Sequence, residues 1–226
     1  MVGSFRAVET TPKGAILLGH VWPVYVFALP LGVRAWGLAH MQRGGSLYAQ
    51  AVFLQETVTV VFLSLVVVLF AIRQRSLRGA HTTFVPGLVA LLGTFLLNVV
   101  GYLPIDATRS IDLLLASSVA VIVGTLWATW SVATLGRCFG LFPEVRGLVT
   151  RGPYRLVRHP VYLGEIVSAV GLMLARPHVV LVLLFVAFVG LQYWRTVYEE
   201  RALCNAFPND YPVYARHVAR LIPGVL

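Results

Sequence analysis

The sequence is poor in charged residues, which make up 12% of its 226 positions, and only nine side chains are acidic. Soluble domains carry about 25% charged residues. Hydrophobic residues instead reach 58%, and the mean hydropathy is +0.80. This scarcity of charge excludes an ordinary soluble protein and predicts an all-α, multi-pass integral membrane protein.

Cysteine is also scarce. The two cysteines, Cys138 and Cys204, belong to no Cys-x-x-Cys pair or other metal-ligand spacing. The sequence therefore excludes a disulfide scaffold and a zinc centre of the usual kind. We expect no metal cofactor.

Lysine is nearly absent, since 17 of the 18 basic residues are arginine and the formal net charge is +9. These arginines lie in short loops between apolar runs and form no continuous basic face, which excludes a nucleic-acid-binding protein. The choice of arginine over lysine, together with abundant Ala, Val and Gly, indicates a bacterial source with a GC-rich genome.

Apolar runs long enough to approach or cross a bilayer recur six times. A membrane core of about 30 Å needs about 20 helical residues. The predicted spans are 15–33, 51–72, 84–103, 111–135, 161–175 and 179–197. The fifth is short for a full crossing, so the number of spans is five or six.

The loops between these spans differ in basic content, with fourteen basic residues on one side and four on the other. The positive-inside rule therefore predicts that both termini and the 136–160 loop are cytosolic, in the bacterial inner membrane. We divide the chain into N-terminal transmembrane helices (1–135) and a catalytic region (136–226) with a loop, a helical hairpin and a cytosolic cap. In the tail, Tyr211, Tyr214, Val218 and Leu221 have helical spacing.

One polar stretch interrupts the apolar chain at 151–164, and the acidic pair Glu199 and Glu200 follows 35 residues later. Charge at the entrance to an apolar segment is costly unless it binds something. Pro160 favours a helix start there, so that free backbone N–H groups face the polar loop beside His159. Such a helix end attracts a carboxylate or phosphate.

The predicted helices place further polar groups together. Tyr162 and Glu165 are three residues apart and share a face of the fifth span, while Arg195 and Glu199 are four apart on the last. Arg195 can orient an anionic acceptor. Trp194 and Tyr198 beside them offer aromatic faces for a cation, or serve as anchors at the membrane interface.

The stretch Leu148-Val-Thr-Arg-Gly-Pro-Tyr-Arg-Leu-Val-Arg-His-Pro-Val-Tyr-Leu-Gly164 resembles the signature of the isoprenylcysteine carboxyl methyltransferase family. The paired glutamates, Tyr211-Pro-Val-Tyr214 and the closing Arg220-Leu-Ile-Pro223 resemble the C-terminal pattern of that family. The resemblance covers about 135–223 and is absent before it.

The resemblance implies a membrane methyltransferase that uses S-adenosylmethionine, held by the last two membrane helices, their loop and the tail. It assigns the methyl acceptor to Arg195, and we add Glu165 as a pocket residue one turn below Tyr162. The expected cofactor-binding residues are Leu148 and Val149 through their backbone groups, and Tyr154, His159, Pro160, Tyr162 and Glu199.

Other interpretations of these residues remain open. Tyr154 and Tyr162 can be interfacial anchors, and the loop residues Arg137, Arg146 and Arg151 orientation signals. Glu200 can face water, neutralised by Arg201. Glu56 lies within an apolar run but near a predicted helix start, and no role is assigned to it.

Two other functions compete with methyl transfer. Membrane sterol and steroid reductases, which use NADPH, look similar around His159 and Gly164-Glu165, although many carry Asn where Val161 stands. A small transporter using Glu56 and Glu165 explains the spans but leaves the polar stretch unexplained. Within the methyltransferase hypothesis, the acceptor is a prenylcysteine-like carboxylate, another lipid or a small thiol, and the oligomeric state is open.

Overall fold

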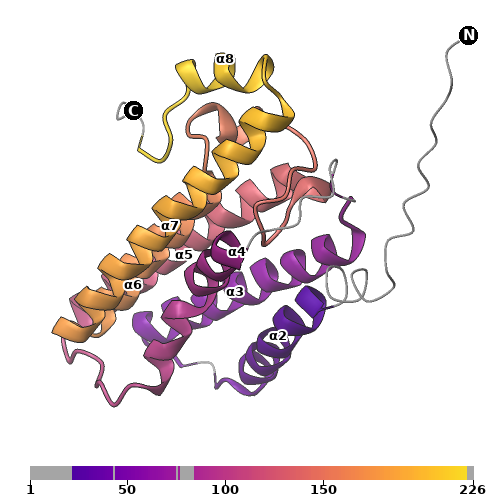
Figure 1. Cartoon of the computed structure of the whole chain (residues 1–226). Helices are drawn as coiled ribbons and strands as arrows, with labels where there is room; N and C mark the ends of the chain where they lie inside the picture. The colour runs from indigo at the N-terminus through magenta and orange to yellow at the C-terminus, as the bar shows by residue number, and fades with distance from the viewer. Residues whose placement is uncertain (1–21, 43, 75, 77–83, 223–226) are drawn as a thin grey trace, which may run out of the picture.

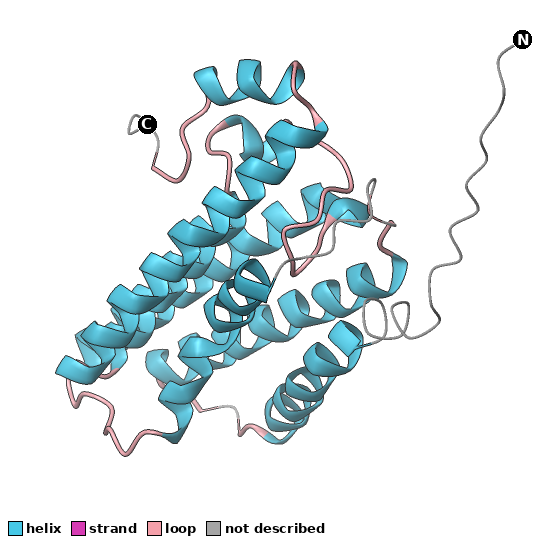
Figure 2. Ribbon diagram, in the orientation of Figure 1, coloured by secondary structure: helices cyan, strands magenta, loops and turns pink. Residues whose placement is uncertain are grey.

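The computed structural model describes residues 22–42, 44–74, 76 and 84–222, and every regular element in this part of the chain is helical (Figures 1 and 2). The expected all-α fold is confirmed. The α-helices are α2 (Trp22–His40), α3 (Leu47–Ile72), α4 (Phe84–Phe95), α5 (Ile111–Leu135), α6 (Pro160–Ala175), α7 (Val179–Ala206) and α8 (Asp210–His217). Short 3-10 helices are η2 (Leu96–Tyr102), η3 (Gly136–Cys138) and η4 (Gly152–Arg155).

Two predicted spans match the structure closely. Helix α5 has the predicted bounds, and α3 begins four residues before position 51 and ends at Ile72. Each begins where a serine, Ser46 or Ser110, accepts a hydrogen bond from a backbone N–H three residues on. Together with α7, they are the described helices that are both long and apolar enough to cross a membrane. The first predicted span begins outside the described residues, and α2 continues to His40.

The third predicted span is wrong in detail, because it is not one α-helix over 84–103. Helix α4 ends at Phe95 and the chain continues as η2. The change follows Gly93, a weak helix former, and Thr94, whose hydroxyl donates to the Ala90 carbonyl at 2.8 Å and so competes with the helix ladder. At about 1.5 Å per α residue and 2.0 Å per 3-10 residue, the two together still extend about 32 Å.

The last two helices differ greatly in length. Helix α6 has 16 residues, which gives about 24 Å at 1.5 Å per residue. Helix α7 has 28 residues and continues to Ala206, well beyond the predicted end at 197. Its final turns therefore project past α6 toward α8 (Figure 1).

Helices α5 and α6 pack in close contact because small residues line their interface. A Cβ atom placed on Gly164 would lie 2.6 Å from the Gly124 carbonyl oxygen, and one on Gly171 would lie 2.7 Å from the Ser117 carbonyl oxygen. Thr125 and Ser168 hydroxyls meet across the interface at 3.4 Å. Small residues of this kind let helix backbones approach in a membrane.

The hydrophobic core lies where α3, α5 and α6 meet the loop that follows α5. Its fully buried members include Phe70, Val132 and Leu141. Phe27 of α2 stacks on Phe70, with 5.3 Å between ring centroids. This packing fixes the base on which the polar loop rests.

We use "cap" for the loop 136–159, α8 and the segment 218–222, which lie at one end of the bundle (Figure 1). The helical spacing predicted through Leu221 is only partly present, because α8 ends at His217. Beyond it, the carbonyls of Ala219 and Arg220 accept hydrogen bonds from the backbone N–H groups of Arg158 and His159, at 2.8 and 3.1 Å. These hydrogen bonds to the loop take the place of further helical turns after His217. The proposed boundary at 135/136 coincides with the end of α5 and stays a prediction.

Candidate active site

A cavity of about 440 Å³ lies inside the bundle and reaches the cap. Its walls come from α2 to α7 and the loop after α5. The predicted site residues that line it are Leu148, Val149, Tyr154, His159, Tyr162, Glu165, Arg195 and Glu199. Pro160 does not line it, but is buried as the first residue of α6.

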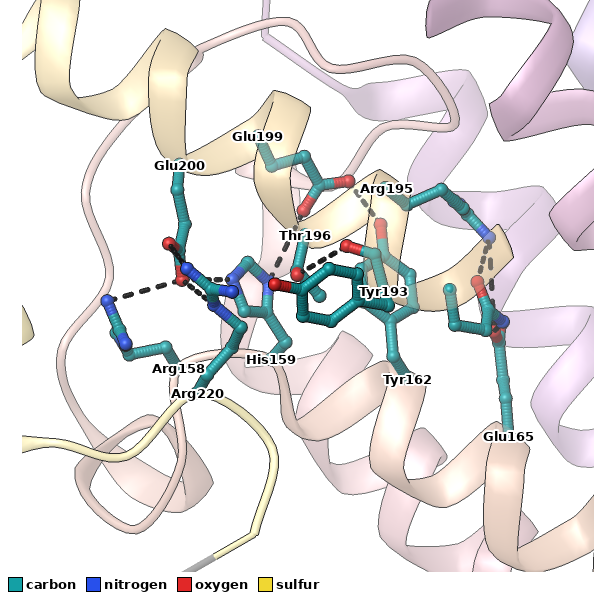
Figure 3. Close-up of polar contacts among 11 residues, drawn as sticks. Arg158, His159, Tyr162, Glu165, Tyr193, Arg195, Thr196, Glu199, Glu200 and Arg220 are labelled. Carbon is teal, nitrogen blue, oxygen red and sulfur yellow. Dashed lines mark hydrogen bonds and ion pairs between the residues drawn. The ribbon is translucent and has the colours of Figure 1, made fainter. Parts of the chain in front are cut away.

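The cap end of the cavity is built around His159, which precedes α6. Its Nδ1 lies 3.6 Å from a Glu199 carboxylate oxygen, and its ring stacks on Tyr162 with 5.7 Å between centroids. The Tyr162 hydroxyl donates to the other Glu199 oxygen. Figure 3 shows these groups converging from α6 and α7. The predicted helical phases of Tyr162 and Glu199 therefore bring them together.

The interpretation that Glu200 faces water beside Arg201 is wrong, because Glu200 is buried. Its side chain is buried and accepts from both Arg220 Nε (3.0 Å) and Nη2 (2.6 Å). His159 Nε2 lies 3.1 Å from Glu200, and Arg158 Nη1 lies 3.2 Å away (Figure 3). Glu200 thus joins the loop, α7 and the segment 218–222. The sequence did hold a signal for this role, because its many arginines have few acidic residues with which to pair.

The two glutamates control the charge of His159. Burial alone would lower the pKa of its imidazole, but the hydrogen bonds and negative charges of Glu199 and Glu200 raise that pKa above its usual value. Burial, with the charge of Glu199, raises the pKa of the Tyr154 hydroxyl well above its usual value. His159 is therefore held in its charged form more firmly than a free histidine, and Tyr154 stays neutral.

A second polar group lies deeper along the cavity. The Arg195 guanidinium is buried, with its carbon 4.5 Å from the centre of the Tyr162 ring and Nη1 3.9 Å from a Glu165 oxygen. Arg195 Nη1 donates to Gln192 Oε1 at 3.1 Å, and the Gln192 amide donates to Glu165. Arg195 and Glu165 thus face each other from α7 and α6. Gln192 was missed because glutamine in an apolar run gave no distinct signal.

The loop arginines that sequence reasoning treated as orientation signals also have structural roles. Arg137 Nε donates to the Ile72 carbonyl at 3.0 Å, and Arg146 Nε to the Gln74 carbonyl at 3.0 Å. Cations at the carboxyl end of a helix are favourable. Arg146 also pairs with Glu144, and both line the cavity.

Some other candidates lie outside the cavity. Trp194 and Tyr198 do not line it, and Trp194 is about half exposed, which fits an interfacial anchor. Glu56 does not line it either, and Arg34 Nη1 contacts both of its oxygens at 2.8 Å. Within the described part of the chain, no group of three or more His, Cys, Asp or Glu side chains is arranged to hold a metal ion.

Comparison with known proteins agrees with this geometry. Residues 113–210 match the model of the phospholipid methyltransferase family. Over these residues, less than half of its length, the chain is similar to that methyltransferase family. The match begins in α5 and ends at the start of α8, so it contains the cap loop, α6 and α7.

Curated relatives agree with the resemblance seen in the sequence, and two of those that follow are isoprenylcysteine methyltransferases by name. Protein-S-isoprenylcysteine O-methyltransferase A of Arabidopsis thaliana is 34% identical over 113 residues, which cover 47% of this chain and 57% of the relative. A probable protein-S-isoprenylcysteine O-methyltransferase of Oryza sativa subsp. indica is 37% identical over 119 residues, covering 47% and 59%. The cobalt-zinc-cadmium resistance protein CzcN of Cupriavidus metallidurans is 36% identical over 99 residues, covering 41% and 45%. The chain thus spans less than three fifths of these relatives' lengths.

Proposed function

We propose that the protein transfers the methyl group of S-adenosylmethionine to a lipophilic acceptor, in the cavity between the cap and α6 and α7. The observation that carries the proposal is that His159, Tyr162, Arg195 and Glu199 line one cavity within a methyltransferase domain. We expect the reaction at the cytosolic face of a bacterial inner membrane. S-adenosylmethionine supplies an activated methyl group for in-line displacement.

The cap end of the cavity suits this cofactor. About 440 Å³ lies within the usual range of about 300–1,000 Å³ for small-molecule sites. Glu199 provides a carboxylate for an ammonium group or hydroxyls, and the Tyr154 and Tyr162 rings provide faces that favour a sulfonium cation. Leu148 and Val149 supply backbone groups at the rim, while Pro160 fixes the start of α6 behind His159.

The deeper end suits the acceptor. Arg195 is a buried cation whose Nε makes no hydrogen bond with the described residues. A guanidinium in this state favours an anionic group such as a carboxylate, and Glu165 limits how close that anion comes to α6. The names of the plant relatives make a prenylcysteine carboxylate the first candidate acceptor. Lipids and small thiols are the other candidates.

In this proposal the chain positions two reactants and excludes water, and no covalent protein intermediate is needed. His159 and Glu199 hold the donor side, and Arg195 orients the acceptor side. The two groups share the Tyr162 ring, which stacks on His159 and lies beneath Arg195. Tyr162 therefore sets the spacing between donor and acceptor.

The deciding experiment measures ligand binding and turnover on purified protein in lipid nanodiscs. S-adenosylmethionine should raise the melting temperature and bind in calorimetry, and NADPH should do neither. Labelled donor should then methylate an N-blocked S-farnesylcysteine or a component of a bacterial lipid extract. Binding of NADPH in place of S-adenosylmethionine would favour the reductase alternative, and absence of both would remove the enzymatic proposal.

A further inference from the structure

The side chain of Arg195 passes directly over a glycine of another helix. A Cβ atom placed on Gly93 of α4 would lie 2.8 Å from Arg195 Cδ and 3.3 Å from Gln192 Oε1. Real Cβ atoms essentially never approach a carbon this closely. Gly93 is buried and lines the same cavity as Arg195. A side chain at position 93 would therefore force the Arg195 side chain out of its present position.

Gln192 lies one turn before Arg195 on α7 and is fully buried. Both ends of its amide are used, because Oε1 accepts from Arg195 Nη1 at 3.1 Å and Nε2 donates to Glu165 of α6. The amide therefore bridges a cation and an anion on different helices. A leucine of similar size would leave both charged groups without this partner, at a cost that a bilayer interior makes large.

The bridge also limits direct pairing between the two charges. Arg195 Nη1 is 3.9 Å from Glu165, too far for a hydrogen bond, whereas Nε remains buried without a hydrogen bond in the described structure. A direct bidentate pair would use the donors of the guanidinium. By standing between them, Gln192 keeps Arg195 over the Tyr162 ring, where its guanidinium carbon is 4.5 Å from the ring centre.

We infer that Gln192 and Gly93 are positioning residues, which hold the Arg195 guanidinium in the orientation that receives the anionic group of the acceptor. The inference rests on the proposed function for the role of Arg195 and deepens it. It concerns the acceptor side only, because the contacts of Gln192 and Gly93 described above are with Arg195, with Glu165 and with each other.

The kinetic test uses Gln192→Leu with S-adenosylmethionine and N-blocked S-farnesylcysteine. The variant should lose roughly tenfold or more in kcat/KM for the acceptor, mostly through KM, because the guanidinium loses its fixed orientation. The Kd for S-adenosylmethionine should stay within about twofold. A merely structural role would weaken donor and acceptor together.

A charge-swapped pair provides the rescue. Glu165→Gln and Gln192→Glu should each impair the acceptor reaction, since the first removes the anion and the second places two carboxylates side by side. The double variant E165Q/Q192E restores one carboxylate, one amide and a chain of hydrogen bonds to Arg195. It should recover the melting temperature relative to either single variant but not the acceptor kcat/KM, because the carboxylate at position 192 then pairs directly with Arg195.

A stability cycle tests the contact without any turnover. Gly93→Ala should lower the melting temperature by several degrees when Arg195 is present, and by much less in an Arg195→Ala background, where the clashing carbon is gone. Gly190→Ala, on α7 with open space around it, is the matched control and should cost nothing.

Equal cost of Gly93→Ala in both backgrounds, or unchanged acceptor kinetics in Gln192→Leu, would overturn the inference. Neither result touches the proposed function, provided the parent protein still transfers methyl groups. If the parent binds no S-adenosylmethionine, the proposed function fails instead, and the stability cycle still decides whether Gly93 and Arg195 are coupled.

Discussion

The two faces of α6 follow opposite packing rules. Toward α5, Gly164, Ser168 and Gly171 bring the backbones into direct contact. Toward α7, the large side chains of Tyr162 and Glu165 hold the helices apart and line a cavity. In lipid, where apolar side chains gain little by meeting each other, close small-residue packing supplies rigidity. Polar groups on the other face are costly and point to function.

One helix therefore carries both the structural and the chemical task, on opposite sides. A rigid α5–α6 pair gives the site a fixed wall, against which α7 and the cap place their charged groups. Substitutions on the two faces should separate into those that prevent folding and those that spare it.

The largest effect is expected on the face of α6 that packs against α5. Gly164→Leu places a side chain where even a Cβ would be 2.6 Å from the Gly124 carbonyl, and should cost about 3 kcal/mol or more. The yield of monodisperse protein and its melting temperature measure this. Gly190→Leu, with nothing within 4 Å of its Cβ position, is the control and should behave like the parent. Equal loss in both variants would contradict the comparison.

On the cavity side of α6, where Arg195 of α7 lies, Arg195→Ala should leave the protein folded but remove the acceptor reaction. Loss of a buried charged partner is worth about 2–4 kcal/mol, or roughly 30- to 1,000-fold in kcat/KM. Radiolabel transfer to S-farnesylcysteine measures it, with donor binding by calorimetry as a check on the site. Arg201→Ala, exposed on the same helix, should keep full activity. Retained turnover in Arg195→Ala would remove its assigned role.

The charged groups around His159 should also make the stability of the protein depend on pH. The pKa of His159 is raised by Glu199 and Glu200 against the opposing effect of burial. The stabilisation is therefore fully present below about pH 6.5, the unfolded value, and is lost as the pH rises through the folded pKa. Melting temperatures from pH 6 to 9 should fall, and His159→Gln should flatten the curve. A slope of opposite sign would mean that His159 is neutral in the folded protein.

The smallest effect is expected from the hydroxyl groups between α5 and α6. Ser168→Ala removes the 3.4 Å contact with the Thr125 hydroxyl. Such contacts between membrane helices average about 0.6 kcal/mol, or roughly 1–2 °C in melting temperature for a protein of this size. Thr125→Ser, which keeps the hydroxyl, should change less. A loss as large as that of Gly164→Leu would show that hydrogen bonding, rather than close approach, joins α5 to α6.

Sequence reasoning succeeded where a pattern had a single physical meaning. The bounds of α5 follow from a long apolar run after a capping serine, Ser110. Tyr162, Arg195 and Glu199 were placed by helical spacing, and the structure brings them to one cavity. Helix phase is local, so it could be derived without knowledge of the tertiary fold.

Failures came where distant segments decide the environment. Glu200 is buried because Arg220, twenty residues later, folds back onto it. Helix α8 ends at His217, and the backbone pairing of Ala219 and Arg220 with Arg158 and His159 that follows it is not revealed by any local pattern. The roles of Gln192 and Gly93 depend on their contacts with the Arg195 side chain, which only the structure shows. Each required knowledge of which helices become neighbours.

The pairing of residues 157–159 with 219–220 has a consequence for biosynthesis. The loop is translated about sixty residues before the segment that completes it, and helices generally form in the order in which they are made. The reaction centre therefore stays unfinished until that segment has left the ribosome. A released chain that ends shortly before Arg220 should insert in the membrane but remain inactive, because its cap lacks the segment that pairs with Arg158 and His159.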